Sequence, residues 1–178
     1  MKNDFVKPIL VLSLICLVIS GALAFTNSVT EPVIAQASAE RENNARYEMI
    51  PEADGFERLD IDGLPATISE VYKATNDVGY IFMILTSGYG GEMKIICAID
   101  SGGILLRNKT LDHTETKGLG AKVADAPFAD RFNGKDSALE GVVAISGATI
   151  SSTAYINAIG DAFKAYDIIR NSEFGIRN

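Results

Sequence analysis

The sequence predicts an α+β protein in which an N-terminal transmembrane helix is followed by one domain with a mostly antiparallel sheet and flanking helices. Three observations support this prediction. An uncharged apolar run covers residues 9–25. Strand-like runs then follow one another with only short turns between them, too short for the crossovers that parallel strands need. Finally, apolar residues recur at helical spacing after Thr149.

The apolar run from Ile9 to Phe25 is about 17 residues long, at the short end for a membrane-spanning helix. Lys2 and Lys7 precede it and no basic residue closely follows it, which predicts a cytoplasmic N-terminus with the remainder of the chain outside. The tripeptide 22–24 (Ala-Leu-Ala) resembles a signal-peptidase site, so a cleaved signal peptide is the alternative. We expect a retained single-pass anchor in the lipid bilayer.

The expected organisation is a cytoplasmic N-terminus over residues 1–8, a transmembrane anchor over 9–26, a stalk or first helix over 27–50 and an extracytoplasmic domain over 51–178. Within the stalk, residues 26–32 predict a polar exit from the membrane. The alanine-rich residues 34–46 predict a helix, because alanine has the highest helix propensity. Residues 51–62 resemble a loop.

Composition excludes several classes of function. The chain carries 16 basic and 23 acidic residues, a net charge of −7, whereas nucleic-acid binding needs a basic surface. Its two cysteines, Cys16 and Cys97, lie in an apolar run and a strand-like run, so a disulfide between them is not expected. With His113 as its one histidine, the chain has too few ligands for a His/Cys metal site.

The domain is expected to contain four strands before its glycine-rich loop, at residues 67–74, 78–85, 93–99 and 104–109. The first alternates apolar and polar residues, as a half-exposed strand does, and the next two are more continuously apolar, which is typical of central strands. A short helix over 126–132 with Pro127 at an early position, a buried strand over 141–145 and a helix over 149–171 complete the prediction.

The segment 146–152, Ser-Gly-Ala-Thr-Ile-Ser-Ser, is a predicted strand-to-helix turn. It combines several hydroxyl groups with the unpaired backbone N–H groups of a helix N-terminus, where the helix dipole also favours negative charge. A phosphate site is therefore one interpretation. The other is an ordinary N-cap, because serine and threonine commonly begin helices.

Residues 146–149 resemble the flavinylation motif of the FMN-binding domain family, Asp-x-x-Ser/Thr-Gly-Ala-Thr, in which the last threonine is esterified to the phosphate of FMN. The resemblance implies that Thr149 carries covalent FMN and that Ser146, Gly147 and Ala148 contact its phosphate and form the turn. Val143 stands where the family has Asp, a position that bears on recognition by the flavin transferase that loads the domain.

Residues 115–120 resemble the family's Glu-Thr-Pro-Gly-Leu-Gly loop, with Lys117 in place of Pro, and residues 88–91 match its Gly-Tyr-Gly-Gly turn. In the family the loop approaches the isoalloxazine ring, which implies contacts to the cofactor from Glu115, Thr116, Gly118, Leu119 and Gly120. Glycines permit close backbone approach and Thr116 can bond the polar edge of the ring. His113 precedes the loop, and we expect no catalytic acid or base there, since the sequence places no partner beside it.

The order of anchor, turn, loop and motif resembles the G subunit of the Rnf complex, the ion-translocating ferredoxin:NAD oxidoreductase of bacterial inner membranes. This resemblance implies an extracytoplasmic electron carrier that works with the other membrane subunits and is loaded by a flavin transferase. The C subunit of the sodium-translocating NADH:quinone oxidoreductase is a related alternative, as is an extracytoplasmic flavoprotein with another acceptor. A third alternative is a non-redox anchored envelope domain whose hydroxyl cluster only caps a helix.

Overall fold

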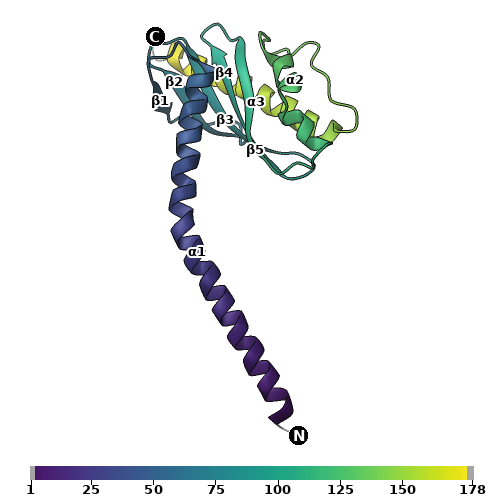
Figure 1. The fold of residues 1–178 in the computed structure, drawn as a ribbon. Helices are drawn as coiled ribbons and strands as arrows, with labels where there is room; N and C mark the ends of the chain where they lie inside the picture. The colour runs from purple at the N-terminus through teal and green to yellow at the C-terminus, as the bar shows by residue number, and fades with distance from the viewer. Residues whose placement is uncertain (1–2, 176–178) are drawn as a thin grey trace. The chain divides into compact units, whose positions relative to one another are not determined.

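The computed structural model describes residues 3–175, and the chain forms two compact units, residues 1–43 and residues 44–178. The first unit consists of most of a single helix, α1 (Asn3–Met49). The second unit contains the last turns of α1, a five-stranded sheet and the remaining helices (Figure 1).

Helix α1 is continuous through residues 26–32, the segment expected to be a polar exit from the membrane. The hydroxyls of Thr26 and Thr30 donate to the carbonyls of Ala22 and Thr26, at 2.9 and 3.0 Å, and so bond within the helix instead of breaking it. Pro32 lies inside the helix and removes one backbone hydrogen-bond donor. The helix nevertheless continues on both sides of it.

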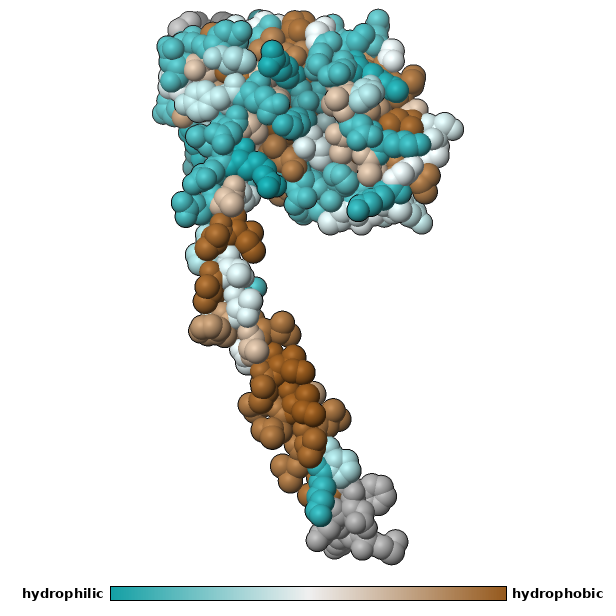
Figure 2. Space-filling model, in the orientation of Figure 1, coloured by the Kyte–Doolittle hydropathy of each residue, from teal (hydrophilic) through white to brown (hydrophobic). Residues whose placement is uncertain are grey.

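The first unit has the surface of a membrane-spanning helix. Within the described residues, one helix is long and apolar enough to cross a bilayer, and none of that apolar segment is buried by protein. Leucine, isoleucine and valine side chains from Ile9 to Leu23 are exposed and form the continuous hydrophobic surface in Figure 2. A lipid bilayer suits such a surface, and an N-terminal signal sequence has the same length and composition.

The sheet is antiparallel throughout, with the order β1-β2-β3-β4-β5. Its strands are β1 (Phe56–Leu59), β2 (Ile68–Ala74), β3 (Gly79–Ser87), β4 (Glu92–Asp100) and β5 (Leu105–His113). The four predicted strands are confirmed. Strand β1 lies in the segment expected to be a loop; with Glu57 and Arg58 exposed at its centre, the sequence carries little strand signal, and pairing with β2 makes it a strand.

Helices cover both faces of the sheet within the second unit. Alternate residues of β4 belong to two separate cores, because successive side chains of a strand point to opposite faces. Ile95 and Cys97 pack in the core that contains α3 (Thr149–Gly175), and Ile96 packs in the core that contains Ala45 and Met49 of α1. This double covering explains why β3 and β4 are almost continuously apolar.

Three short helices follow β5: η1 (Gly120–Ala124), α2 (Ala126–Ala129) and η2 (Asp130–Phe132). The predicted helix over 126–132 is confirmed as α2 and η2. The predicted strand over 141–145 is wrong. Its peptide groups bond to side chains and to turn residues instead of a strand. Arg131 Nη1 donates to the Val143 carbonyl at 3.2 Å, Ile145 N donates to Ser152 Oγ at 3.0 Å, and Val142 N donates to the Leu139 carbonyl at 3.2 Å.

A buried polar network fixes α3 against the sheet. The Tyr155 hydroxyl donates to Asn108 Oδ1 at 2.7 Å, and Asn108 Nδ2 donates to the carbonyl of Ala129 at 2.8 Å. Both side chains are buried, and burial raises the pKa of Tyr155 above its ordinary value. The neutral tyrosine therefore remains a donor, and it ties α3, β5 and the end of α2 together.

We expect Tyr155→Phe to lower the free energy of unfolding by about 1–3 kcal/mol, because it leaves a buried acceptor on Asn108 without its donor. Urea denaturation of the detergent-solubilised chain measures the change. Tyr47→Phe is the matched control: Tyr47 is 42% exposed and an exposed hydroxyl is expected to contribute less than about 0.5 kcal/mol. Equal losses in the two variants would contradict the role of the network.

Candidate functional site

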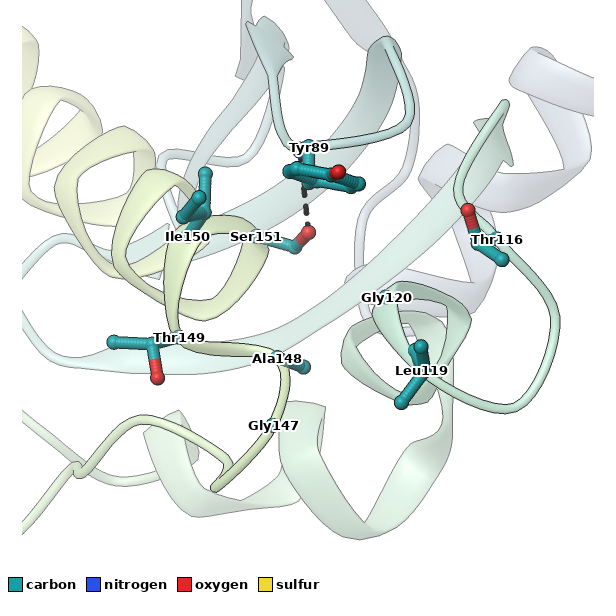
Figure 3. Close-up of a pocket in the computed structure, with 9 residues that line it drawn as sticks. All are labelled: Tyr89, Thr116, Leu119, Gly120, Gly147, Ala148, Thr149, Ile150 and Ser151. Carbon is teal, nitrogen blue, oxygen red and sulfur yellow. Dashed lines mark hydrogen bonds between the residues drawn. The ribbon is translucent and has the colours of Figure 1, made fainter.

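A cavity of about 440 Å³ lies where three segments of the second unit meet (Figure 3). The segments are the β3–β4 turn, the loop that leads from β5 into η1, and the start of α3. The lining residues are Tyr89 from the first, Thr116, Leu119 and Gly120 from the second, and Gly147, Ala148, Thr149, Ile150 and Ser151 from the third. The volume is typical of pockets that hold small molecules.

The β3–β4 turn is tied to the start of α3. Gly88 N donates to the carbonyl of Gly91 at 2.9 Å, which closes the turn, and Tyr89 N donates to Ser151 Oγ at 3.3 Å (Figure 3). Gly91 adopts a φ of 130°, which favours glycine. The Tyr89 side chain is 75% exposed, so the turn presents an aromatic ring at the cavity without burying it.

The start of α3 presents unpaired donors to the cavity. Ser152 N donates to the Ala148 carbonyl at 2.9 Å and is the first amide of the helix with a backbone acceptor. The amides of the three preceding residues, 149–151, have no acceptor among the residues that the structure describes. Because these amides lie at the positive end of a 27-residue helix, an anion is favoured there.

The hydroxyls around this helix start do not cap it. Ser151 Oγ accepts from Tyr89 N, and Ser152 Oγ accepts from Ile145 N at 3.0 Å and donates to the Ala148 carbonyl at 2.8 Å. Thr149 is exposed, and its hydroxyl makes no hydrogen bond within residues 3–175. The arrangement therefore favours the phosphate-site interpretation over an ordinary N-cap, and it leaves the Thr149 hydroxyl chemically available.

Glu115 lies behind the cavity wall and does not line it. Its side chain is buried, with the residue 6% exposed, and Oε2 accepts from Gly90 N at 3.2 Å. A Cβ added at Gly88 or at Gly120 would overlap the carboxylate. The absence of side chains at these two glycines thus allows the turn and η1 to close on opposite sides of the carboxyl group.

Most of the residues predicted for the site meet at the cavity. Those that line it are Thr116, Leu119, Gly120, Gly147, Ala148 and Thr149; Ser146 and Gly118 are exposed and are not part of the lining. Tyr89, Ile150 and Ser151 line it without having been assigned a role from the sequence, although Tyr89 belongs to the turn that carries the family resemblance. His113 ends β5, and its Nδ1 accepts from Glu115 N at 3.2 Å, a structural contact.

Known proteins match this chain over most of its length. The FMN-binding domain model matches residues 88–164, a range that contains every residue lining the cavity. The G subunit of the Na(+)-translocating ferredoxin:NAD(+) oxidoreductase complex of Acetobacterium woodii is 32% identical over 90% of this chain and 92% of its own length. The G subunit of the ion-translocating oxidoreductase complex of Methanosarcina acetivorans is 31% identical over 90% of this chain and 94% of its own length.

A third relative, the G subunit of the proton-translocating ferredoxin:NAD(+) oxidoreductase complex of Clostridium ljungdahlii, is 25% identical over 85% of each chain. The domain that follows the anchor is thus an FMN-binding domain. More specifically, the chain belongs to the G-subunit family of Rnf-type ion-translocating oxidoreductase complexes.

The residues of the cavity fit a phosphorylated flavin. Unpaired amides at the start of α3 suit its phosphate, and the free hydroxyl of Thr149 lies beside them. Leu119, Ile150 and Tyr89 supply apolar and aromatic surface, each more than half exposed at the cavity. The amides suit the charged phosphate of the flavin, and the apolar and aromatic side chains suit its flat ring.

We expect Gly120→Ala to lower the free energy of unfolding by about 1–3 kcal/mol, since the added Cβ overlaps the Glu115 carboxylate. In a Glu115→Ala background the same substitution should cost at least about 0.5 kcal/mol less, because the overlapping atoms are gone. Urea denaturation of the four proteins of this cycle tests the contact. Gly160→Ala in α3 is the control, because a Cβ added there has no atom within 4 Å. If the costs of Gly120→Ala and Glu115→Ala in free energy of unfolding were additive, the proposed contact would be refuted.

Proposed function

We propose that this protein is the membrane-anchored electron-carrier subunit of an Rnf-type ion-translocating ferredoxin:NAD oxidoreductase, with FMN attached through a phosphoester to Thr149. The observation that carries the proposal is the free Thr149 hydroxyl beside unpaired helix amides at a cavity of about 440 Å³. Membership of the G-subunit family supports the redox role. The relatives are named for sodium in one case and protons in another, so their names do not determine the coupling ion of this chain.

The chain's own residues would bind and orient the cofactor, and FMN would supply reversible electron transfer. The amides of residues 149–151 would hold the phosphate, with Gly147 at a φ of 83° forming the turn beneath it. Thr116 would offer its hydroxyl to the polar edge of the ring. Leu119 and Tyr89 would contact its faces or its apolar edge and exclude water, which strengthens the electrostatic effect of nearby groups.

Formation of the phosphoester needs an activated donor, because a hydroxyl and a phosphate monoester do not condense favourably in water. In the proposed step, the Thr149 Oγ–P bond forms while a phosphoanhydride P–O bond of a flavin nucleotide breaks. The nucleoside monophosphate is the leaving group, and it takes up the proton of the Thr149 hydroxyl. The step is a group transfer in which nothing is oxidised or reduced. A flavin transferase would carry out this step. Thr149, the last residue of the motif, and Val143, at its first position, are both exposed and accessible to such an enzyme.

Two findings favour this proposal over its alternatives. The curated relatives described above are all named as G subunits, which favours the Rnf complex over a sodium-translocating NADH:quinone oxidoreductase. The lack of any capping bond from the Thr149 hydroxyl within the described residues favours a cofactor site over a non-redox envelope domain. Other membrane subunits of the complex would be the electron-transfer partners.

Thr149→Ala, co-expressed with a flavin transferase, should lose all covalent flavin and keep its fold, because only the acceptor hydroxyl is removed. The measurement is flavin fluorescence of the protein band on a denaturing gel under ultraviolet light. Thr153→Ala removes an exposed hydroxyl one turn further along α3 and should keep the fluorescent band. A fluorescent band that persists in Thr149→Ala would refute the attachment site.

For the anchor, we propose a single pass through the bacterial inner membrane with the N-terminus in the cytoplasm and the FMN-binding domain outside. Lys2 and Lys7 lie before the apolar run and support this orientation. Protease added to intact spheroplasts should then degrade the domain. In a separate measurement without protease, the intact mass of the chain extracted from the membrane should include its first 25 residues. Protection of the domain from protease would overturn the orientation, and loss of those residues would instead support a cleaved signal peptide.

A further inference from the structure

The mouth of the cavity exposes apolar side chains. Among the described residues of the second unit, Tyr89 is 75% exposed, Ile150 60% and Leu119 54%, and all three line the cavity. Val143, which is 63% exposed, lies in the segment that leads to Thr149 and does not line the cavity. The other exposed large apolar side chains of this unit are only 36% to 42% exposed. The greatest apolar exposure of the domain therefore lies on the three segments that meet at the cavity.

The segments around the cavity also carry positive charge in an acidic chain. These rim segments comprise residues 88–91, 116–122 and 143–153. Their charged residues are Lys117 and Lys122, and they contain no Asp or Glu, whereas the whole chain has a net charge of −7. Both lysines are exposed, and among the described residues neither has a carboxylate within ion-pair distance. By contrast, Lys109 and Lys164 each pair with a carboxylate at 2.8 Å.

A ligand inside the cavity does not account for these features, because Val143 and both lysines lie outside the lining. An apolar and aromatic centre with charges around it is the composition of a protein interface. Two lysines are few for an anionic membrane surface, which is bound by clusters of about four to eight basic residues. A symmetric pair of copies would place the rim segments against themselves, with the lysines of both copies together and no carboxylate to pair with them.

We propose that the rim segments are the docking surface for another subunit of the complex, one that presents carboxylates around an apolar centre. The inference rests on the proposed function, in which this chain exchanges electrons with other membrane subunits. Carboxylates opposite Lys117 and Lys122 would steer the encounter, and apolar groups would cover Tyr89 and Leu119. A partner seated there would lie over the mouth of the cavity that is proposed to hold FMN.

The first test is the rate at which an N-hydroxysuccinimide ester acetylates each lysine, measured by mass spectrometry. It compares the complex, purified in detergent through a tag on this chain, with the full chain alone in phosphatidylcholine nanodiscs. We expect acetylation of Lys117 and Lys122 to be at least about tenfold slower in the complex, because the partner covers them. Lys164 is the control: its side chain is 72% exposed, it lies outside the rim segments, and its rate should change less than about twofold.

The second test identifies the chemistry of the partner surface. A carbodiimide joins an ammonium group directly to a carboxylate that is in contact with it, without a spacer. In the purified complex we expect it to join Lys117 or Lys122 to an aspartate or glutamate of another subunit, located by peptide mass spectrometry. Cross-links from these lysines to carboxylates of this chain alone would contradict the proposed surface.

The third test reverses the charge of the surface. Lys117→Glu combined with Lys122→Glu should slow reduction of the flavin by the remainder of the complex at least about tenfold at low salt, and added salt should narrow the difference. Lys109→Glu combined with Lys164→Glu reverses as many charges away from the rim segments and should change the rate less than about twofold. Both double variants should keep covalent flavin, since none of the four lysines lines the cavity.

Each other occupant has its own result. Slow acetylation of both rim lysines in the chain alone in phosphatidylglycerol nanodiscs would assign the surface to lipid, and carbodiimide links between isotopically distinct copies would assign it to self-association. Either result would overturn the inference, as would equal acetylation in the complex and in the chain alone. A chain without covalent flavin whose lysines are still covered in the complex would overturn the flavin attachment and leave the docking surface standing. Covalent flavin with freely acetylated lysines would do the reverse.

Discussion

The site depends on a steric constraint: the β3–β4 turn and the start of η1, distant in the sequence, must close around one buried carboxyl group. Glu115 fits because Gly88 and Gly120 lack side chains, and the Gly90 amide bonds to it at 3.2 Å. Ser151 then joins the turn to α3 by accepting from the Tyr89 amide. Without this closure the turn, the loop and the helix start would have no common cavity, and the donors of α3 would face open solvent.

The sheet could be predicted where its strands are apolar and bounded by glycine or aspartate turns, as β3 and β4 are. Strand β1 could not, because two of its residues are charged and its conformation depends on pairing with β2. The apolar, β-branched segment 141–145 led to the opposite error. Two of its backbone groups bond to the side chains of Arg131 and Ser152, and Val142 N bonds within a turn to the Leu139 carbonyl; the residue pattern of 141–145 does not show these partners.

The site was predictable to the extent that its chemistry is local. The helix start at Thr149 follows from a hydroxyl- and glycine-rich turn before an amphipathic run, and the structure places it at the cavity. Glu115 was assigned to the cofactor from its loop, whereas the structure places it behind the wall, because the sequence does not show which glycines close on it. The role of Ser151 depends on a contact with Tyr89, 62 residues away in the chain.

The central claim, that Thr149 is the flavin attachment residue, is tested most directly by peptide mass mapping of the wild-type chain purified from cells that contain a flavin transferase. Trypsin should release residues 136–164 as one peptide, which holds Thr149 and the other hydroxyls of the α3 start. The account predicts that this peptide carries the mass of FMN less one water and that fragmentation places the added mass on Thr149. An unmodified peptide, or an added mass on Ser146, Ser151 or Thr153, would contradict it.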